Sequence, residues 1–353
     1  MKVMQVANSK KVKGGITSVV NSIEEGLSDR VAIARHPSYI SGVPAPLKIA
    51  YSLLAMFKFI CLVHPYRIIH LHSAANGSFY RKTIYTYMSK LFRKKVIFHI
   101  HGSSFEAFHD KSSFNAWLIN KTLNRADEII VLSNQMKQLV LAYCSNTQIS
   151  ILPNPITIPS QAVMKQPKDN TDKIQLLFMG EIGQRKGIYD LVDAIRLLPK
   201  EISSKLVLNI CGNNELDKLR SYIQERDVGH ACIVHGWIDG EKKRTLLANS
   251  DIYVLPSYHE GLPVSILEAM ANELPIISTT VGGIPEIVLN DVNGYIMPPG
   301  SIEHLAESIE KLVNNEDLRV SFGRKSKSMV KNHDIRIVAK QLHDIYKRIN
   351  ASS

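Results

Sequence analysis

Residues 2–27 read KVMQVANSKKVKGGITSVVNSIEEGL, and residues 173–198 read KIQLLFMGEIGQRKGIYDLVDAIRLL. Each stretch combines an apolar strand pattern, a glycine-bearing loop and an amphipathic helix pattern. Further short apolar, β-branched runs follow each stretch, separated by helical patterns, at 66–71, 95–100, 128–132, 206–211, 251–255 and 275–278. Strands that alternate with helices are typical of parallel sheets covered on both faces. The sequence therefore predicts an α/β chain of two Rossmann-like domains, with parallel sheets facing a central cleft.

The domain boundaries follow from proline content and helical periodicity. A proline-rich stretch without periodicity predicts a linker at about 155–172, between a first domain at 1–160 and a second at 172–330. Residues 335–353 begin with apolar positions three or four apart, which predicts an amphipathic helix that packs back on the first domain. The length of 353 residues and the 45% hydrophobic content fit two buried cores, and exclude a small disulfide-stapled module.

The cysteines and the apolar segments indicate a reducing, cytoplasmic setting. The four cysteines show no paired spacing and each has apolar neighbours, so we expect buried thiols. The amino terminus lacks the apolar region of a signal peptide. The longest apolar stretch, 49–63, covers 15 positions around Lys58, which is short for a spanning helix. Two interpretations of this stretch stay open: an ordinary core helix and a peripheral membrane helix.

The net charge of +11 is distributed unevenly along the chain. Residues 1–165 hold 20 Lys and Arg against 7 Asp and Glu, a balance of +13, whereas residues 166–353 hold 23 against 25, a balance of −2. An anionic membrane surface could attract such a basic first domain, and so could a nucleic acid. A solvated basic face without a partner is the third interpretation. No RNA-recognition, KH or zinc-finger pattern supports nucleic-acid binding.

The segment DIYVLPSYHEGLPVSILEAMANELPIIST, residues 251–279, carries the clearest functional signal. A strand pattern is followed by a loop and then by a helix pattern, with Pro263 expected in the first helical turn. Backbone N–H groups at the amino end of a helix form a site for an anion such as a diphosphate. Two carboxylates, Glu260 and Glu268, flank this place and can accept hydrogen bonds from hydroxyls. A ligand with an anionic centre and hydroxyl-bearing ends, such as a sugar nucleotide, fits both features.

This segment resembles the signature of retaining, nucleotide-sugar-dependent glycosyltransferases of family 4, which are group 1 enzymes. Glu260, GLP at 261–263 and EAMA at 268–271 match it, and so does the later TTVGGIPEIV at 279–288. The resemblance implies the GT-B fold over nearly the whole chain. It also implies that Glu260 contacts the donor sugar, that Glu268 holds the ribose hydroxyls, and that Gly261 and Leu262 offer backbone amides.

The second motif of the family appears in MGEIGQRKG, residues 179–187. There the resemblance implies that Lys186 binds the diphosphate. Glu181 occupies the position where the family often has arginine, and Arg185 is a candidate for the missing cation. In the first domain, Gly14 and Gly15 match the loop that covers the donor phosphates, and His101 matches a residue near the reacting sugar.

The resemblance implies transfer with retention, without a bound cofactor or metal, from a nucleoside diphosphate sugar to a hydroxyl. We assign no metal to the strand histidines His70, His72 and His99. A UDP-sugar is favoured over a GDP-sugar, a choice that depends on residues 235–238. The expected acceptor is a glycan, linked to a polyprenyl diphosphate, in surface polysaccharide or O-antigen assembly at the cytoplasmic face of the inner membrane. The alternatives are a soluble sugar acceptor and a basic nucleic-acid-binding protein.

Overall fold

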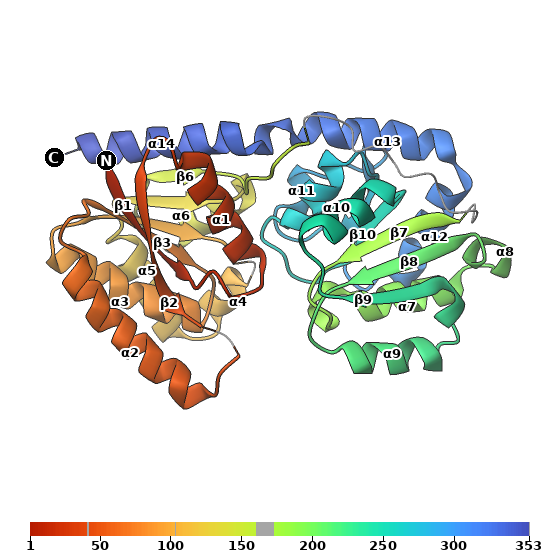
Figure 1. Ribbon diagram of the computed structural model, residues 1–353, viewed down its shortest axis with the longest axis horizontal. Coiled ribbons are helices and arrows are strands. Elements are labelled where there is room, and N and C mark those ends of the chain that lie inside the picture. Colours follow the sequence, from red (N-terminus) through yellow and green to blue (C-terminus); the bar gives the residue numbers. More distant parts are fainter. Residues whose placement is uncertain (41, 103, 160–172, 353) are drawn as a thin grey trace. The chain divides into compact units, whose positions relative to one another are not determined.

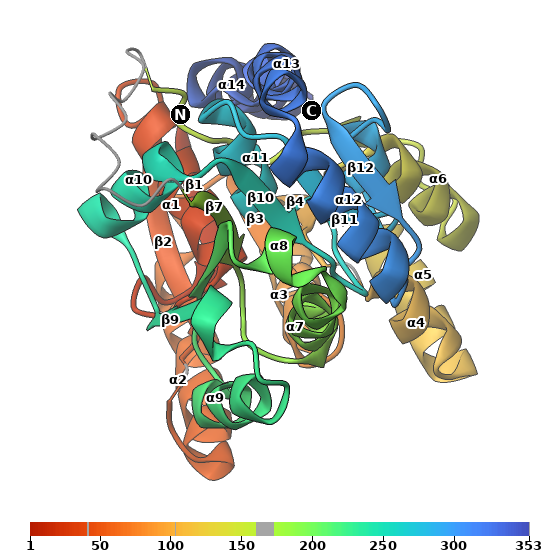
Figure 2. The same cartoon turned by 90° about the vertical axis from the view of Figure 1, so that its right-hand side faces the viewer.

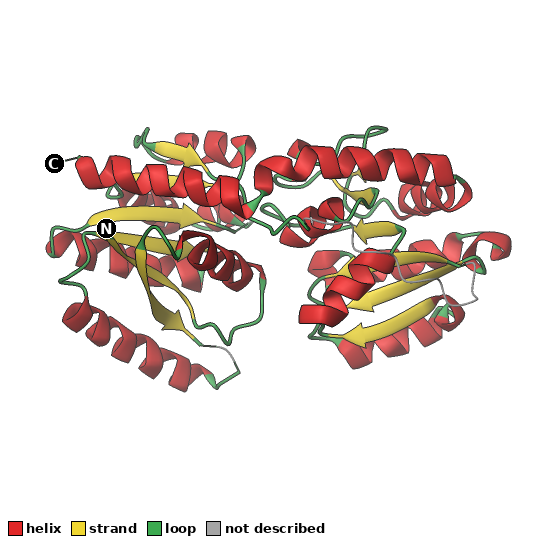
Figure 3. Cartoon of the chain, turned by 45° about the horizontal axis from the view of Figure 1, so that its top comes forward, coloured by secondary structure: helices red, strands yellow, loops and turns green. Residues whose placement is uncertain are grey.

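The computed structural model describes residues 1–40, 42–102, 104–159 and 173–352. The chain divides into two compact units, each with helices on both sides of a sheet (Figures 1 and 3). Unit 1 comprises Met1–Thr157 and His333–Ser353, and unit 2 comprises Ile158–Asn332. Most of the predicted linker, residues 160–172, lies outside the described residues.

Unit 1 contains a six-stranded sheet in the order β2-β1-β3-β4-β5-β6, and all of its neighbouring strands are parallel. The strand order reverses at β1, which pairs with β2 on one side and with β3 on the other. Such a reversal marks the edge of a parallel sheet where ligands bind. The strands are β1 (Lys2–Asn8), β2 (Ala32–Tyr39), β3 (Ile68–Ser73), β4 (Lys95–Ile100), β5 (Glu128–Val131) and β6 (Ile149–Ile151).

The helices of unit 1 are α1 (Gly15–Leu27), α2 (Ala45–Leu62), α3 (Gly77–Leu91), α4 (Phe105–Asp110), α5 (Ser113–Leu123), α6 (Asn134–Tyr143) and α14 (Ile335–Ala351). The carboxyl-terminal helix α14 packs on α1 (Figure 1). Several side-chain contacts join it to the sheet; among them, the Tyr346 hydroxyl lies 2.7 Å from His70 Nδ1, and Arg348 lies 2.8 Å from the Glu128 carboxylate. These contacts explain why residues 333–353 belong to unit 1.

Unit 2 contains a second parallel sheet, in the order β12-β11-β10-β7-β8-β9. Its strands are β7 (Ile174–Met179), β8 (Leu206–Cys211), β9 (Cys232–Gly236), β10 (Ile252–Leu255), β11 (Ile276–Thr279) and β12 (Gly294–Met297). Its α-helices are α7 (Ile188–Leu197), α8 (Lys200–Ser203), α9 (Leu216–Glu225), α10 (Gly240–Asn249), α11 (Val264–Ala271), α12 (Ile302–Asn314) and α13 (Glu316–Met329). Helices α7 and α12 pack side by side (Figure 2). Short 3-10 turns lie at η1 (Gln184–Lys186), η2 (Gly229–Ala231), η3 (Ile284–Glu286) and η4 (Val330–His333).

The structure excludes one of the two interpretations of residues 49–63 and shows that the expectation of buried thiols is wrong for two of the cysteines. Helix α2 is not a core helix, because Ala55 and Phe59 are its buried residues while Leu54 and Phe57 are 69% and 68% exposed. The thiol of Cys61 is exposed on this helix and Cys232 is half-buried, so only Cys144 and Cys211 are buried as expected. Apolar composition alone could not reveal that α2 covers the sheet with one narrow side.

Helix α2 is also longer than the 15-residue stretch suggested. Among the described residues it is the one helix long and apolar enough to cross a membrane, judged by its 18 residues and its mean hydropathy of 1.6. Only 11% of that window is buried, so most of its apolar surface faces away from the protein.

Candidate functional site

The loop between β10 and α11 in unit 2 holds Glu260 in a fixed position. The Ser257 hydroxyl donates to Glu260 Oε1 at 2.8 Å, and the Thr279 hydroxyl donates to the Ser257 carbonyl. Pro263 precedes the helix as its cap residue and lies one position before the expected first turn. Because a proline side chain has no hydrogen-bonding group, the amino end of α11 has no side-chain cap from Pro263.

The glycine-rich loop after β11 packs directly against this turn. Gly283 N donates to the Gly261 carbonyl at 2.7 Å. Gly282 has φ of 54°, and a Cβ at that position would lie 1.9 Å from the Glu260 carbonyl oxygen. Only glycine fits there, because a side chain would be strained by the positive φ and would collide with the backbone. The predicted motifs at 260–263 and 279–288 thus form one structural unit.

Each glutamate of the motif is paired with a lysine. Lys186, from η1, forms an ion pair with Glu260, and the two side chains are only 14% and 7% exposed. Lys243, from α10, lies 2.6 Å from Glu268 in the second turn of α11. Each ion pair thus places a cation suited to phosphate next to a carboxylate suited to hydroxyls.

Arg185 lies next to this group. Its guanidinium is 2.9 Å from the carboxylate of Glu181, in an ion pair with both side chains about half exposed. Tyr258 N donates to the Arg185 carbonyl at 2.9 Å, and Gly187 has φ of 69° with its Cα close against the Pro256 carbonyl. The RKG turn therefore packs on the loop that carries Glu260. A role for Arg185 in diphosphate binding stays a prediction.

The three site residues predicted in the first domain all follow strands of the unit 1 sheet at its carboxyl edge. Gly14 caps α1 with φ of 147°, and Gly15 begins that helix; a Cβ at either position would meet no atom within 4 Å. His101 follows β4 directly, and its backbone N–H donates to the Ser73 carbonyl at 2.8 Å. The loop and the histidine thus occupy the edge where parallel sheets bind ligands.

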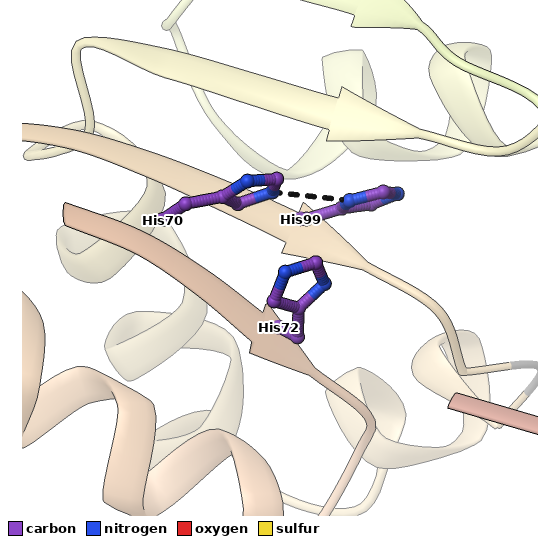
Figure 4. A group of neighbouring side chains, drawn as sticks. All are labelled: His70, His72 and His99. Atoms are coloured by element: carbon purple, nitrogen blue, oxygen red, sulfur yellow. Dashed lines mark hydrogen bonds between the residues drawn. The ribbon is translucent and has the colours of Figure 1, made fainter. Parts of the chain in front are cut away.

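His101 belongs to a buried column of four histidines, in which His70 and His72 lie on β3 and His99 lies on β4. His101 Nε2 lies 2.9 Å from His72 Nδ1. His70 Nε2 lies 3.2 Å from His99 Nδ1, and Figure 4 shows this pair together with His72. Burial lowers the pKa of His70 and of His101 to about 3, and lowers the pKa of His72 and His99 well below the usual value. All four imidazoles are therefore neutral at physiological pH.

Nitrogens of His70, His72 and His99 lie within 4.8 Å of one another, which is close enough to raise the question of a metal ion. However, the rings of His70 and His72 are stacked, with centroids 4.1 Å apart and planes inclined by 27°. Stacked rings direct their nitrogen lone pairs in parallel, whereas metal ligands converge on one point. The geometry favours hydrogen bonding between the histidines, and the absence of a metal stays a prediction.

Sequence reasoning missed two residues that contact predicted site residues: Lys243, which pairs with Glu268, and His72, which lies beside His101. Lys243 sits in the run KKR at 242–244, where nothing in the sequence marks it as the partner of Glu268. His72 alternates with apolar residues along a strand, and only the pairing of β3 with β4 brings it beside His101. In both cases the partner lies on a separate element, so local patterns carry no signal.

Two family models match the chain. Residues 17–158 match the model described as Glycosyltransferase Family 4, and residues 160–329 match the model described as Glycosyl transferases group 1. Together the two models cover most of both units.

A relative from Escherichia coli, UDP-Gal:alpha-D-GlcNAc-diphosphoundecaprenol alpha-1,3-galactosyltransferase, is 24% identical over 84% of this chain and 78% of its own. Among solved structures, sucrose-phosphate synthase from Thermosynechococcus elongatus matches all of both chains, with a TM-score of 0.82 and 18% identity. Anabaena HepE in complex with UDP-glucose matches 99% of this chain and 100% of its own, with a TM-score of 0.80 and 18% identity. The chain therefore belongs to the family 4 glycosyltransferases of group 1 and has the GT-B fold.

Proposed function

We propose that this glycosyltransferase moves a sugar from a UDP-sugar to a hydroxyl of a lipid-linked glycan, with retention at the anomeric carbon. The observation that carries the proposal is that Glu260 and Glu268 each form an ion pair with a lysine, Lys186–Glu260 and Lys243–Glu268. A UDP-sugar has a diphosphate between two hydroxyl-bearing sugars, so it offers phosphate oxygens to a lysine and hydroxyls to both carboxylates.

The donor assignments follow from this match. A diphosphate beside Lys186 would neutralise the lysine and release the Glu260 carboxylate to accept hydrogen bonds from the donor sugar. Glu268 would accept from the ribose hydroxyls, while Lys243 holds it in place. The backbone amides of Gly261 and Leu262, at the amino end of α11, would complete the site for phosphate oxygens.

Uridine as the base of the donor is supported by two similarities. The Escherichia coli relative carries UDP-Gal in its name, and the Anabaena protein has the same fold and binds UDP-glucose. We therefore propose a UDP-sugar as the donor, with a GDP-sugar as the alternative.

The proposed reaction needs no bound metal. The bond from the anomeric carbon to the diphosphate oxygen breaks, and a bond to the acceptor oxygen forms on the same face. The acceptor proton passes to the departing UDP. Lys186 and the amino end of α11 would stabilise the charge that develops on the diphosphate, the function that a metal ion serves elsewhere. Glu260 would position the sugar in this scheme and would not attack it.

A lipid-linked acceptor is supported by helix α2. Its exposed apolar side chains include Leu47, Ile49, Leu53, Leu54 and Phe57. Together with the basic first half, these side chains suit peripheral binding to an anionic bilayer at the cytoplasmic face of the inner membrane. The Escherichia coli relative is named for a diphosphoundecaprenol-linked substrate, which supports surface polysaccharide assembly as the setting. A soluble sugar acceptor is the alternative.

A transfer assay tests the proposal. Purified full-length protein is incubated in EDTA with a panel of UDP- and GDP-sugars and a synthetic lipid-diphosphate sugar, and the anomeric configuration of the product is read by NMR. We expect an α-linked product from an α-linked UDP-sugar. Glu260→Gln should lower kcat at least 100-fold, whereas Glu303→Gln, at an exposed position of α12, should leave it unchanged. A kcat of the Glu260→Gln variant within a few-fold of the wild-type value would disprove the role of Glu260.

A further inference from the structure

Lys82 of α3 is a buried cation that the donor site does not use. Its side chain is 1% exposed, and its ammonium donates to the Ser38 hydroxyl at 2.6 Å. The Ser38 hydroxyl in turn donates to the Ala7 carbonyl at 3.1 Å. Across the described ranges, no carboxylate forms an ion pair with Lys82. A buried ammonium with only a hydroxyl as partner is costly, and burial together with Arg81 lowers the pKa of Lys82 to about 7.

The neighbouring Arg81 is a second cation without a counter-ion among the described residues. Its guanidinium lies over the Tyr39 ring, 4.8 Å from the centroid, and its Nε is buried without a hydrogen-bond partner in the described part of the chain. Its Nη1 also lies 3.5 Å from where a Cβ on Gly77 would stand, so the guanidinium reaches the first turn of α3. Arg81 is half-buried and reaches the surface, whereas the adjacent Lys82 is buried.

The two cations lie at the ligand-binding edge of the unit 1 sheet. Ser38 and Tyr39 end strand β2, and Arg81 and Lys82 occupy the second turn of the helix that follows β3. The carboxyl ends of parallel strands meet at one edge, next to the reversal of strand order at β1. Helix α2 begins six residues after β2 ends, and its exposed apolar side chains start near this edge with Leu47 and Ile49.

We propose that Arg81 and Lys82, the latter held by Ser38, bind the phosphate groups of a lipid-diphosphate acceptor, with the apolar chain of that lipid lying along α2. The inference rests on the proposed function in that the acceptor is a lipid-linked glycan. Phosphate oxygens supply the counter-ion that both cations lack. The Arg81 guanidinium suits paired hydrogen bonds to one phosphate, and the ammonium of Lys82 acts as a point charge. The exposed apolar side chains of α2 would then make the site bind a lipid diphosphate more tightly than a free diphosphate.

Calorimetry on the protein tests this subsite with three probes: inorganic pyrophosphate and geranylgeranyl diphosphate, each titrated with the donor site filled by UDP, and UDP alone. We compare the wild type with Lys82→Met, Arg81→Gln and the control Lys121→Met, which removes an exposed cation from α5. Charge-assisted hydrogen bonds contribute about 1.5–3 kcal/mol, so each site variant should weaken both diphosphate probes by about 10- to 100-fold. The control should bind like the wild type, and UDP affinity should stay unchanged in every variant.

The three probes separate the outcomes. Tighter binding of geranylgeranyl diphosphate than of pyrophosphate, lost in the site variants, supports a lipid-diphosphate subsite. If pyrophosphate and geranylgeranyl diphosphate bind with equal affinity, and both affinities still depend on Lys82, the result would overturn the proposed contact of the lipid chain with α2. Affinities in Lys82→Met and Arg81→Gln that equal those of Lys121→Met would overturn the whole subsite. Because Arg81 is half-buried, its variant keeps the test valid if Lys82→Met fails to fold. If the protein binds geranylgeranyl diphosphate in this way but transfers no sugar to a lipid, the result would support the subsite and disprove the proposed function.

Discussion

The ammonium of Lys243 lies 2.6 Å from the carboxylate of Glu268 and so joins α10 to the second turn of α11. The two residues are 25 positions apart in the sequence. The pair restrains the carboxylate that we assign to the ribose, in the same way that Ser257 and Lys186 restrain Glu260. Both glutamates of the motif are therefore held by neighbours before any ligand reaches them.

Replacement of Lys243 by methionine tests this restraint. We expect Lys243→Met to lower UDP affinity by about 3- to 10-fold, because the carboxylate of Glu268 loses the charge that orients it. The free energy of unfolding should change by less than about 1 kcal/mol, since a partly exposed ion pair contributes little to stability. Calorimetry and urea denaturation measure the two effects. The adjacent, exposed Lys242 supplies the control, and equal UDP affinities in Lys242→Met and Lys243→Met would disprove the role of the pair.

Gly282 allows a second test, because it is the closest point between the glycine-rich loop and the Glu260 turn. In Gly282→Ala the new methyl group would stand 1.9 Å from the Glu260 carbonyl oxygen, at a backbone φ of 54°. We expect a loss of more than about 1 kcal/mol in the free energy of unfolding, and a lower affinity for UDP. Gly229→Ala places a methyl group in open space and should show neither effect. A fully stable Gly282→Ala variant with normal affinity would contradict the packing described here.

The buried histidine column predicts how stability depends on pH. The folded protein keeps His70 and His101 neutral down to about pH 3, whereas the unfolded chain takes up protons below about pH 6.5. The unfolded state therefore binds more protons in that window, and the free energy of unfolding falls as the pH is lowered from 6.5. Each excluded proton adds about 1.4 kcal/mol per pH unit to the slope.

Urea denaturation at pH 7.5, 6 and 5 measures this slope. His99→Gln keeps a hydrogen-bonding side chain beside His70 but cannot titrate, so we expect a slope smaller by up to one proton. His304→Gln, at an exposed position of α12, should retain the wild-type slope. A stability that is flat between pH 7.5 and 5 would show that the column does not exclude protons.

Sequence reasoning recovered most of the sheets, since their strands are continuous apolar runs buried on both faces. The runs 95–100 and 206–211 coincide with β4 and β8, whereas β3 ends two residues beyond its run. The motif around Glu260 could be identified from the sequence because its residues are close together along the chain. Lys243 and His72 were not, because their partners are reached only through the fold. The exposure of α2 was equally hidden, as core and surface helices can share one apolar composition.

The exposed apolar side chains of α2 predict that the protein binds to membranes. Co-sedimentation with phosphatidylglycerol vesicles at low salt should capture the wild-type protein, and Leu54→Glu with Phe57→Glu should abolish most of this binding. Both side chains are about two-thirds exposed, so the fold should tolerate the change. The control is Phe114→Glu, at an exposed aromatic position of α5. Failure of the wild type to sediment, or equal sedimentation of the two variants, would contradict membrane binding through α2.

The central claim is that the glutamate turn of unit 2 binds a nucleoside diphosphate, and calorimetry of UDP binding in EDTA tests it most directly. GDP, ADP and NAD serve as competitors, and Glu303→Ala is the control for Glu268→Ala. We predict that UDP binds selectively without metal and that Glu268→Ala weakens it at least tenfold. Binding of none of these nucleotides, or a Glu268→Ala affinity equal to that of the wild type, would contradict the account.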